Sequence, residues 1–181
     1  YWRRSAWTFA EVGAFWDGVA ENYDEINSHT TSYFRRFLDT FRLADLPNEA
    51  RFLDICSRTG NGTAFFSSHG KVGSAVCADV SFKMGEICRE HLKEKGVKDF
   101  EWVVMNDYAL PFPDSEFDVV LCLETVEHFS EPEQLVKELG RIIKPHGVMI
   151  LSTPNVLWEP VHALAAITKY HHSEGPHRFI R

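Results

Sequence analysis

The sequence predicts an α/β protein with a doubly wound, Rossmann-like, mostly parallel sheet. Short apolar runs of strand length alternate with segments whose apolar residues recur at helical spacing, which is the strand–helix–strand order of such folds. One run, Val119–Leu123, is apolar throughout, as expected for a strand buried on both faces of a parallel sheet. With 181 residues, of which 44% are hydrophobic, the chain suits one domain with a full core.

We expect this single domain to contain three segments in order. They are an N-terminal helical cap (1–48), a nucleotide-binding α/β core (49–155) and a C-terminal helix with a His-rich tail (156–181). The cap is rich in aromatic residues, and its apolar side chains at helical spacing predict a helix buried against the sheet. Those side chains are Phe34, Phe37, Leu38 and Phe41.

The first expected strand, Phe52–Cys56, ends in a loop rich in Ser, Thr, Asn and Gly. A loop of this kind that leads into an apolar helix presents free backbone N–H groups to a polar or anionic ligand, and Asn61 or Thr63 is expected to cap that helix. The second expected strand, Ala75–Ala78, ends at Asp79. Asp79 follows the loop at roughly the 20-residue spacing at which an acid reaches a ribose hydroxyl in nucleotide-binding units.

The next helix and strand of the core bring polar residues to the ligand-binding edge of the sheet. A helix with one apolar face is expected over Phe82–Leu92. The third strand, Trp102–Met105, delivers Asn106, Asp107 and Tyr108 at its carboxyl end, where ligands bind in open parallel sheets.

The last expected helix of the core has clear start and stop signals. Ser130 is a predicted N-cap, and Pro132 and Glu133 suit a first helical turn with a capping box. Pro145–Gly147 is expected to stop this helix before a fifth strand, Val148–Leu151.

Beyond the fifth strand the sequence predicts one helix, Glu159–Tyr170, and no further pair of strands.

Composition limits the classes of function. The net charge of −7 argues against a general nucleic-acid binder, which needs a basic face. No apolar run is long enough to span a bilayer, and the first residues lack the core of a signal peptide. The cysteines show no Cys-x-x-Cys spacing and are read as reduced core residues of a cytoplasmic protein. They are Cys56, Cys77, Cys88 and Cys122.

Several motifs in order resemble the class I S-adenosylmethionine-dependent methyltransferases. They are the loop from Asp54 to Gly60, Asp79, and the later segment Leu110–Val120. The family's loop pattern is Asp-x-Gly-x-Gly-x-Gly, of which this chain keeps the aspartate and the last glycine. A cysteine, Cys56, and an arginine, Arg58, stand at the other two glycine positions.

The resemblance implies two more strands after the fifth, so we expect the C-terminal edge of the sheet to be missing or truncated. It also implies S-adenosylmethionine as the cofactor and assigns roles to particular residues. The family's N-terminal helix often covers the cofactor, with a tyrosine beside it, and an acid after the third strand meets the adenine amino group. The alignment leaves Asn106 and Asp107 open for that acid. Arg58 could meet the cofactor carboxylate, but its charge is unfavourable beside a sulfonium, so we expect it to face solvent. The cofactor-binding candidates are Tyr23, Asp54, Cys56, Gly60, Asp79, Val80, Asn106, Asp107 and Tyr108.

A second constellation, Glu-x-x-Glu-His, follows the fourth strand, and Ser-Thr-Pro-Asn follows the fifth. Both resemble ubiquinone-biosynthesis O-methyltransferases, and the first also resembles small-RNA 2′-O-methyltransferases that hold a divalent metal. His128 is the candidate general base. A divalent metal is not expected, and its alternative ligands are Glu124, Glu127, His128 and a later histidine, with His177 among the candidates.

The leading hypothesis is therefore a methyltransferase that acts on O, N or C of a small-molecule acceptor, without a nucleic acid or membrane partner. The alternative is a degenerate family member that serves as a binding or scaffold module, because Cys56 and Arg58 replace two glycines. A nicotinamide-dependent oxidoreductase ranks third, since the loop lacks Gly-x-Gly-x-x-Gly.

Overall fold

The computed structural model describes residues 7–153, and it contains a five-stranded sheet in the order β3-β2-β1-β4-β5. All the strand pairs of this sheet are parallel, which confirms the predicted fold class. The strands are β1 Ala50–Ile55, β2 Val72–Asp79, β3 Phe100–Val104, β4 Phe117–Leu123 and β5 Ile143–Ser152. The helices are α1 Phe9–Val19, α2 Tyr23–Ser28, α3 Thr31–Leu43, α4 Asn61–Ser68, α5 Phe82–Glu94 and α6 Pro132–Ile142, with 3₁₀ helices η1 Ala20–Asn22 and η2 Val126–His128.

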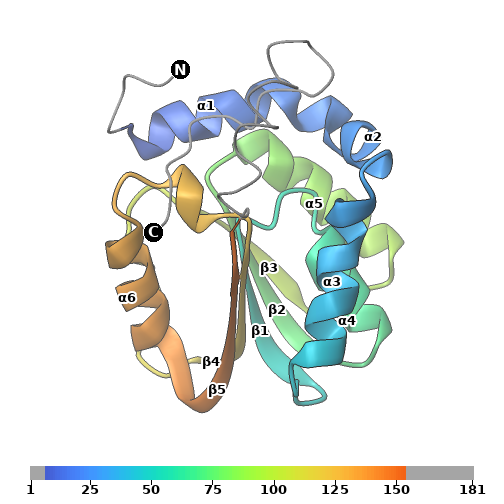
Figure 1. Ribbon diagram of the computed structural model, residues 1–181, viewed down its shortest axis with the longest axis vertical. Coiled ribbons are helices and arrows are strands. Elements are labelled where there is room, and N and C mark those ends of the chain that lie inside the picture. The colour runs from blue at the N-terminus through green and yellow to red at the C-terminus, as the bar shows by residue number, and fades with distance from the viewer. Residues whose placement is uncertain (1–6, 154–181) are drawn as a thin grey trace.

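Helices cover both faces of the sheet and one of its ends. In Figure 1, α3, α4 and α5 lie on one side of the sheet and α6 lies on the other. Helix α1 lies across the top of the view, above the carboxyl ends of the strands, and α5 contacts it. The segment 105–116 joins β3 to β4 without a helix. The carboxyl ends of the strands, where α/β folds bind their ligands, are therefore covered by the N-terminal helices.

The centre of the sheet follows from the apolar runs in the sequence. Leu53 of β1 pairs with Val76 of β2 and with Val120 of β4, and all three side chains are buried. Strands β1 and β4 are buried on both faces because α4 and α5 pack on one side and α6 on the other. The four cysteines are free and buried, as predicted for core residues.

The predicted N-caps of two helices are wrong. The N-cap of helix α4 is Gly60, and not Asn61 or Thr63. The Asn61 side chain instead donates to Asp24, and the Thr63 hydroxyl donates to Asp54. Helix α6 has Glu131 as its N-cap, without a side-chain cap bond. The Ser130 hydroxyl instead accepts a bond from the Trp7 backbone N–H and donates to the Trp7 carbonyl. A tertiary contact has replaced the local capping box.

The stop signal after α6 also differs from the prediction. Helix α6 ends at Ile142, and Pro145–Gly147 lies inside β5 rather than between a helix and a strand. The pairing of β4 with β5 is irregular between Phe117 and Val119. An irregular register of this kind accommodates a proline, which has no N–H for the ladder.

The buried stripe of α3 is shifted from the predicted one. Phe34 is 49% exposed and Leu38 is also exposed, whereas Tyr33 and Phe37 are buried. Phe37 stacks on Phe65 of α4 with the ring centroids 6.0 Å apart. Helix α3 therefore packs on a neighbouring helix rather than on the sheet, which turns a different face inward.

Several predictions lie outside the described residues. They concern the end of the Ser-Thr-Pro-Asn motif, the helix Glu159–Tyr170, the His-rich tail with His177, and the missing sheet edge. Within residues 7–153, no helix is both long enough and apolar enough to cross a membrane.

Candidate functional site

The loop after β1 has the backbone that the family's glycines provide. Cys56 and Arg58 have φ of 52°, and Gly60 has φ of 79°, so all three glycine positions of the pattern lie in the left-handed region. A non-glycine residue in this region costs on the order of 1 kcal/mol or more, which the surrounding structure must offset. The loop therefore keeps a glycine-type conformation although two of its glycines are replaced.

Asp79 at the end of β2 ties this loop to the neighbouring strand. Its side chain is fully buried, at 0% exposed. One carboxylate oxygen accepts the backbone N–H of Arg58 at 2.8 Å, and the other accepts the backbone N–H of Ser81 at 2.9 Å. The predicted ribose-binding acid thus lies directly beside the loop.

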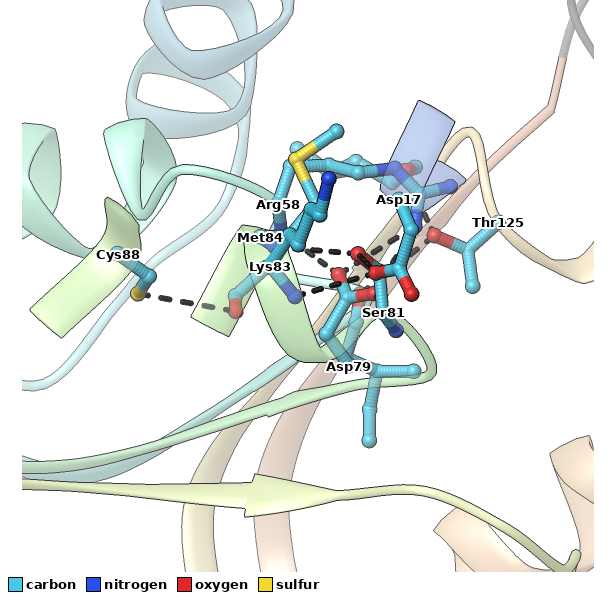
Figure 2. Close-up of polar contacts among 11 residues, drawn as sticks. Asp17, Arg58, Asp79, Ser81, Lys83, Met84, Cys88 and Thr125 are labelled. Carbon is cyan, nitrogen blue, oxygen red and sulfur yellow. Dashed lines mark hydrogen bonds and ion pairs between the residues drawn. The ribbon is translucent and has the colours of Figure 1, made fainter. Parts of the chain in front are cut away.

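The side chain of Arg58 folds back onto Asp79 (Figure 2). Its Nη1 lies 3.3 Å and 3.5 Å from the two carboxylate oxygens, and its guanidinium stacks 3.9 Å above the ring of Trp16. Arg58 is only 6% exposed, so the prediction that it faces solvent is wrong. Arg58 can be buried because the buried carboxylate of Asp79 pairs with its guanidinium and replaces the water that would otherwise solvate the charge.

The charge of Arg58 is retained in this buried position. Burial disfavours the charged guanidinium, but the carboxylate of Asp79 outweighs this effect, so the pKa of Arg58 lies above its usual range. The two residues therefore form a buried ion pair at the carboxyl ends of β1 and β2.

Asp54 holds the start of α4. Its carboxylate accepts the backbone N–H of Thr63 at 3.2 Å and the Thr63 hydroxyl at 2.9 Å. Burial raises the pKa of Asp54 to about 6, although the bonds from Thr63 oppose the rise. Asp54 thus positions the loop through the helix that follows it.

The thiol of Cys56 is not arranged as a nucleophile. Burial raises its pKa to about 12, and the nearby Arg58 only partly offsets this rise. At neutral pH the thiol is protonated, and the thiolate is the reactive form. Cys56 therefore contributes to the site through its backbone conformation.

The N-terminal helices fasten onto the site through two acids that the sequence reasoning missed. Asp17 of α1 accepts the Ser81 hydroxyl at 2.6 Å and the Lys83 backbone N–H at 3.1 Å. Asp24 of α2 accepts the hydroxyl of Thr59 at 2.7 Å and the amide of Asn61 at 2.8 Å. The one signal in the sequence is that each acid directly follows an aromatic residue.

Helix α1 also approaches the site closely through a glycine. A Cβ on Gly13 would lie 2.6 Å from the carbonyl oxygen of Val80, the residue after Asp79. The rings of Trp16 and Tyr23 meet edge to face at 6.0 Å, and both side chains are buried. Tyr23 thus lies in the cap as predicted, with Trp16 rather than Tyr23 over the Arg58 guanidinium.

The end of β3 presents its polar residues toward solvent. Asn106 and Asp107 are both exposed. One Asp107 oxygen accepts the backbone N–H groups of Tyr108 and Ala109, which shapes the turn. The ring of Tyr108 lies 4.9 Å from that of Phe9, so this turn also reaches the N-terminal cap.

The residues of the Glu-x-x-Glu-His segment after β4 have two different environments. Glu124 accepts the hydroxyl of Ser152 at 2.6 Å, which joins the ends of β4 and β5. Glu127 and His128 are buried in η2, and the His128 ring meets Trp16 edge to face at 5.3 Å. No group of three or more acids, histidines or cysteines in residues 7–153 is arranged to hold a metal ion. His177, the alternative fourth ligand, lies outside this range.

Residues 53–151 match the family model described as a methyltransferase domain, which covers more than half of the chain. The chain belongs to the class I S-adenosylmethionine-dependent methyltransferases. The family resemblance predicted from the loop motif, Asp79 and the segment Leu110–Val120 is thereby confirmed.

Among curated relatives of this methyltransferase is the ubiquinone/menaquinone biosynthesis C-methyltransferase UbiE of Yersinia enterocolitica. The two are 32% identical over 155 residues, which is 83% of this chain and 62% of the relative. The corresponding protein of Yersinia pestis is 31% identical over the same shares. The chain thus spans less than two thirds of the length of these relatives.

Solved structures share the fold of this methyltransferase. YcgJ of Bacillus subtilis has a TM-score of 0.65 at 28% identity, over 75% of this chain and 59% of its own. The [4+2]-cyclase SpnF has a TM-score of 0.73 at 19% identity, over 82% of this chain and 61% of its own. Because a cyclase shares it, the fold alone does not specify methyl transfer.

The residues of the site fit the cofactor of this methyltransferase family in type and position. A carboxylate at the end of β2 suits the two hydroxyls of a ribose, and the left-handed loop beside it allows close approach of the backbone. Arg58 is the exception, because its side chain is bonded to that same carboxylate. The cofactor therefore fits this site only if the Arg58 side chain moves away from Asp79.

Proposed function

We propose that this protein transfers a methyl group from S-adenosylmethionine to a small-molecule acceptor. The observation that carries the proposal is the left-handed backbone at Cys56, Arg58 and Gly60 beside the buried Asp79. Strain of this kind persists only where the structure enforces it, and it clusters at binding sites. The left-handed loop beside a buried acid supports a binding site for the cofactor at this place.

The proposed binding residues come from three strand ends. Asp79 accepts the ribose hydroxyls, the loop from Cys56 to Gly60 and the backbone of Val80 approach the cofactor, and Asp54 holds the loop. Asn106 or Asp107 receives the adenine amino group, with Tyr23 and Tyr108 at the border of the site. The bound cofactor supplies an electrophilic methyl group on a sulfonium, and the protein aligns the acceptor for in-line displacement.

For the acceptor we propose a carbon atom of a small aromatic molecule. The relatives are named as C-methyltransferases of ubiquinone and menaquinone biosynthesis, which supports carbon over oxygen or nitrogen. Aromatic side chains also gather at this edge of the site, where Phe9 lies 5.2 Å from Phe129 and Trp16 lies 5.3 Å from His128. In this proposal His128 takes the proton that the acceptor loses as its carbon bonds to the methyl group.

The alternative function is a methyltransferase-fold scaffold without activity. The Arg58–Asp79 ion pair favours it, because the pair uses the carboxylate on which cofactor binding depends. The two functions differ in one measurable property, the affinity for S-adenosylmethionine and its demethylated product.

We would titrate the protein with S-adenosylmethionine and S-adenosylhomocysteine by calorimetry, in parallel with Asp79→Asn. The asparagine keeps the size of the side chain and an acceptor for one backbone N–H. Asp114→Asn is the matched control, because Asp114 is exposed and pairs with Arg141 away from the loop. The proposal would be supported if the unchanged protein and Asp114→Asn bind with micromolar affinity and Asp79→Asn binds at least about tenfold more weakly.

The absence of heat with either ligand, from a protein that unfolds cooperatively, would overturn the proposal in favour of the scaffold. For the acceptor, transfer of an isotope-labelled methyl group to a panel of phenols and hydroquinones is followed by mass spectrometry and NMR of the product. A label on oxygen or nitrogen would contradict the proposed carbon acceptor.

A further inference from the structure

Arg58 stands where the family pattern has a glycine, and its side chain reaches back to the carboxylate of the same site. Its backbone N–H and its guanidinium both bond to Asp79. A glycine there would keep the backbone bond and lose the side-chain bonds. The arginine therefore adds a second interaction to a contact that the backbone already makes.

The carboxylate of Asp79 has no exposed side left. Its two oxygens accept the backbone N–H groups of Arg58 and Ser81, and both lie within 3.5 Å of the Arg58 guanidinium. A vicinal diol needs the same carboxylate positions that the guanidinium uses. The diol and the guanidinium thus compete for one acceptor.

The competition extends to the N-terminal cap. The guanidinium lies between Asp79 and the ring of Trp16, which is fixed on α1. Asp17, on the same helix, accepts bonds from Ser81 and Lys83 and holds α1 against the start of α5. Figure 2 shows Arg58, Asp17, Asp79 and Ser81 gathered in one cluster.

We propose that Arg58 is an internal competitor of the cofactor, which closes the site by pairing with Asp79 under Trp16. The inference rests on the proposed function and deepens it, because it identifies the residue that sets cofactor affinity. Binding then requires the guanidinium to leave Asp79, so the observed affinity equals the intrinsic affinity multiplied by the fraction of molecules in which Arg58 has left. Removing the guanidinium removes this penalty.

The test compares Arg58→Gly, Arg58→Met and Arg51→Met with the unchanged protein by calorimetry with S-adenosylhomocysteine. Arg58→Gly restores the family residue, and Arg58→Met removes the charge but keeps much of the bulk. Arg51→Met is the matched control, because Arg51 pairs with Glu116 at the opposite end of β1 and also lies over an aromatic ring. We expect Arg58→Gly to bind at least about tenfold more tightly and Arg51→Met to bind within about twofold of the unchanged protein.

The outcomes separate this inference from the proposed function. If the unchanged protein binds and Arg58→Gly binds equally or more weakly, the inference is overturned and the proposed function stands. If neither protein binds, both are overturned. Tighter binding by Arg58→Gly but not by Arg58→Met would overturn the inference, because it would assign the effect to the volume of the side chain and not to the guanidinium.

A second measurement tests the ion pair without any ligand. Urea unfolding of Arg58→Met, Asp79→Asn and the double variant forms a double-mutant cycle. We expect the double variant to lose less stability than the two single variants together, because each single change leaves a buried charge without its partner. Additive losses would show that the two side chains do not interact, which would overturn the inference even if Arg58→Gly folds poorly.

Discussion

Replacement of Asp54 by asparagine should change how the stability of the protein depends on pH. Asp54 is buried at the end of β1, and its carboxylate accepts two hydrogen bonds from Thr63 at the start of α4. Burial raises its pKa from 3.8 to about 6, so the folded protein binds a proton at this site more tightly than the unfolded chain does. An asparagine keeps an oxygen for the Thr63 N–H and does not titrate.

The sign and size of the effect follow from this shift. Below the unfolded pKa the carboxyl is protonated in both states, and as pH rises toward the folded pKa the unfolded chain loses its proton first. The wild-type protein therefore loses stability as the pH rises from about 4 to about 6, and the loss stays above that range. A shift of about 2 units at about 1.36 kcal/mol each corresponds to about 3 kcal/mol.

The assay is urea unfolding of both proteins at intervals from about pH 4 to about pH 7, with the difference in unfolding free energy plotted against pH. We expect Asp54→Asn to gain about 3 kcal/mol relative to wild type across this range. A difference that does not change with pH would refute the reasoning, because it would mean that burial does not raise the pKa of Asp54.

Asp118→Asn provides a control of opposite sign. Burial raises the pKa of Asp118, but bonds from Lys144 and from the Arg51 backbone outweigh burial and lower it overall. The stability that Asp118 contributes is therefore present above its unfolded pKa and is lost as the pH falls through its folded pKa. Relative to this variant, the wild-type protein should gain stability as the pH rises through the acid range.

Three further predictions concern the cap and the chemistry. Gly13→Ala should lower the unfolding free energy by about 1–3 kcal/mol in a urea titration, because the new methyl group meets the Val80 carbonyl oxygen. Gly18→Ala on the same helix meets nothing within 4 Å and should not be destabilising. Asp17→Ala should speed amide hydrogen exchange in α1, since two bonds to the start of α5 are lost. His128→Gln should slow methyl transfer by about 10²-fold or more and flatten the pH–rate profile, with cofactor affinity kept in calorimetry.

The order of the core elements was predictable because each is marked by its own local pattern. The run from Phe117 to Leu123 has no polar residue except Asp118, and it forms the buried strand β4. The spacing from the loop to Asp79 predicted an acid that reaches a ribose hydroxyl, and the structure places Asp79 beside the loop, where it accepts the backbone N–H of Arg58. Parallel strands joined by helices leave few other arrangements.

Predictions about single side chains failed where a partner distant in the sequence decided the outcome. Ser130 bonds to Trp7 instead of capping α6, and Arg58 is buried on Asp79 instead of facing solvent. The acids Asp17 and Asp24 carried no recognised motif, yet they fasten the cap to the site. A local pattern contains no information on which distant side chain offers a free acceptor.

The sequence by itself determined the fold class, the family and the strand ends at which the candidate site lies, because apolar periodicity and motif spacing are properties of the chain alone. Only the tertiary structure decided that the loop keeps its left-handed backbone with Cys56 and Arg58 in place of glycines. It also decided that Arg58 is buried on Asp79 beneath Trp16. The physical reason is that a buried charge takes the nearest complementary group, and folding, not sequence order, brings that group near.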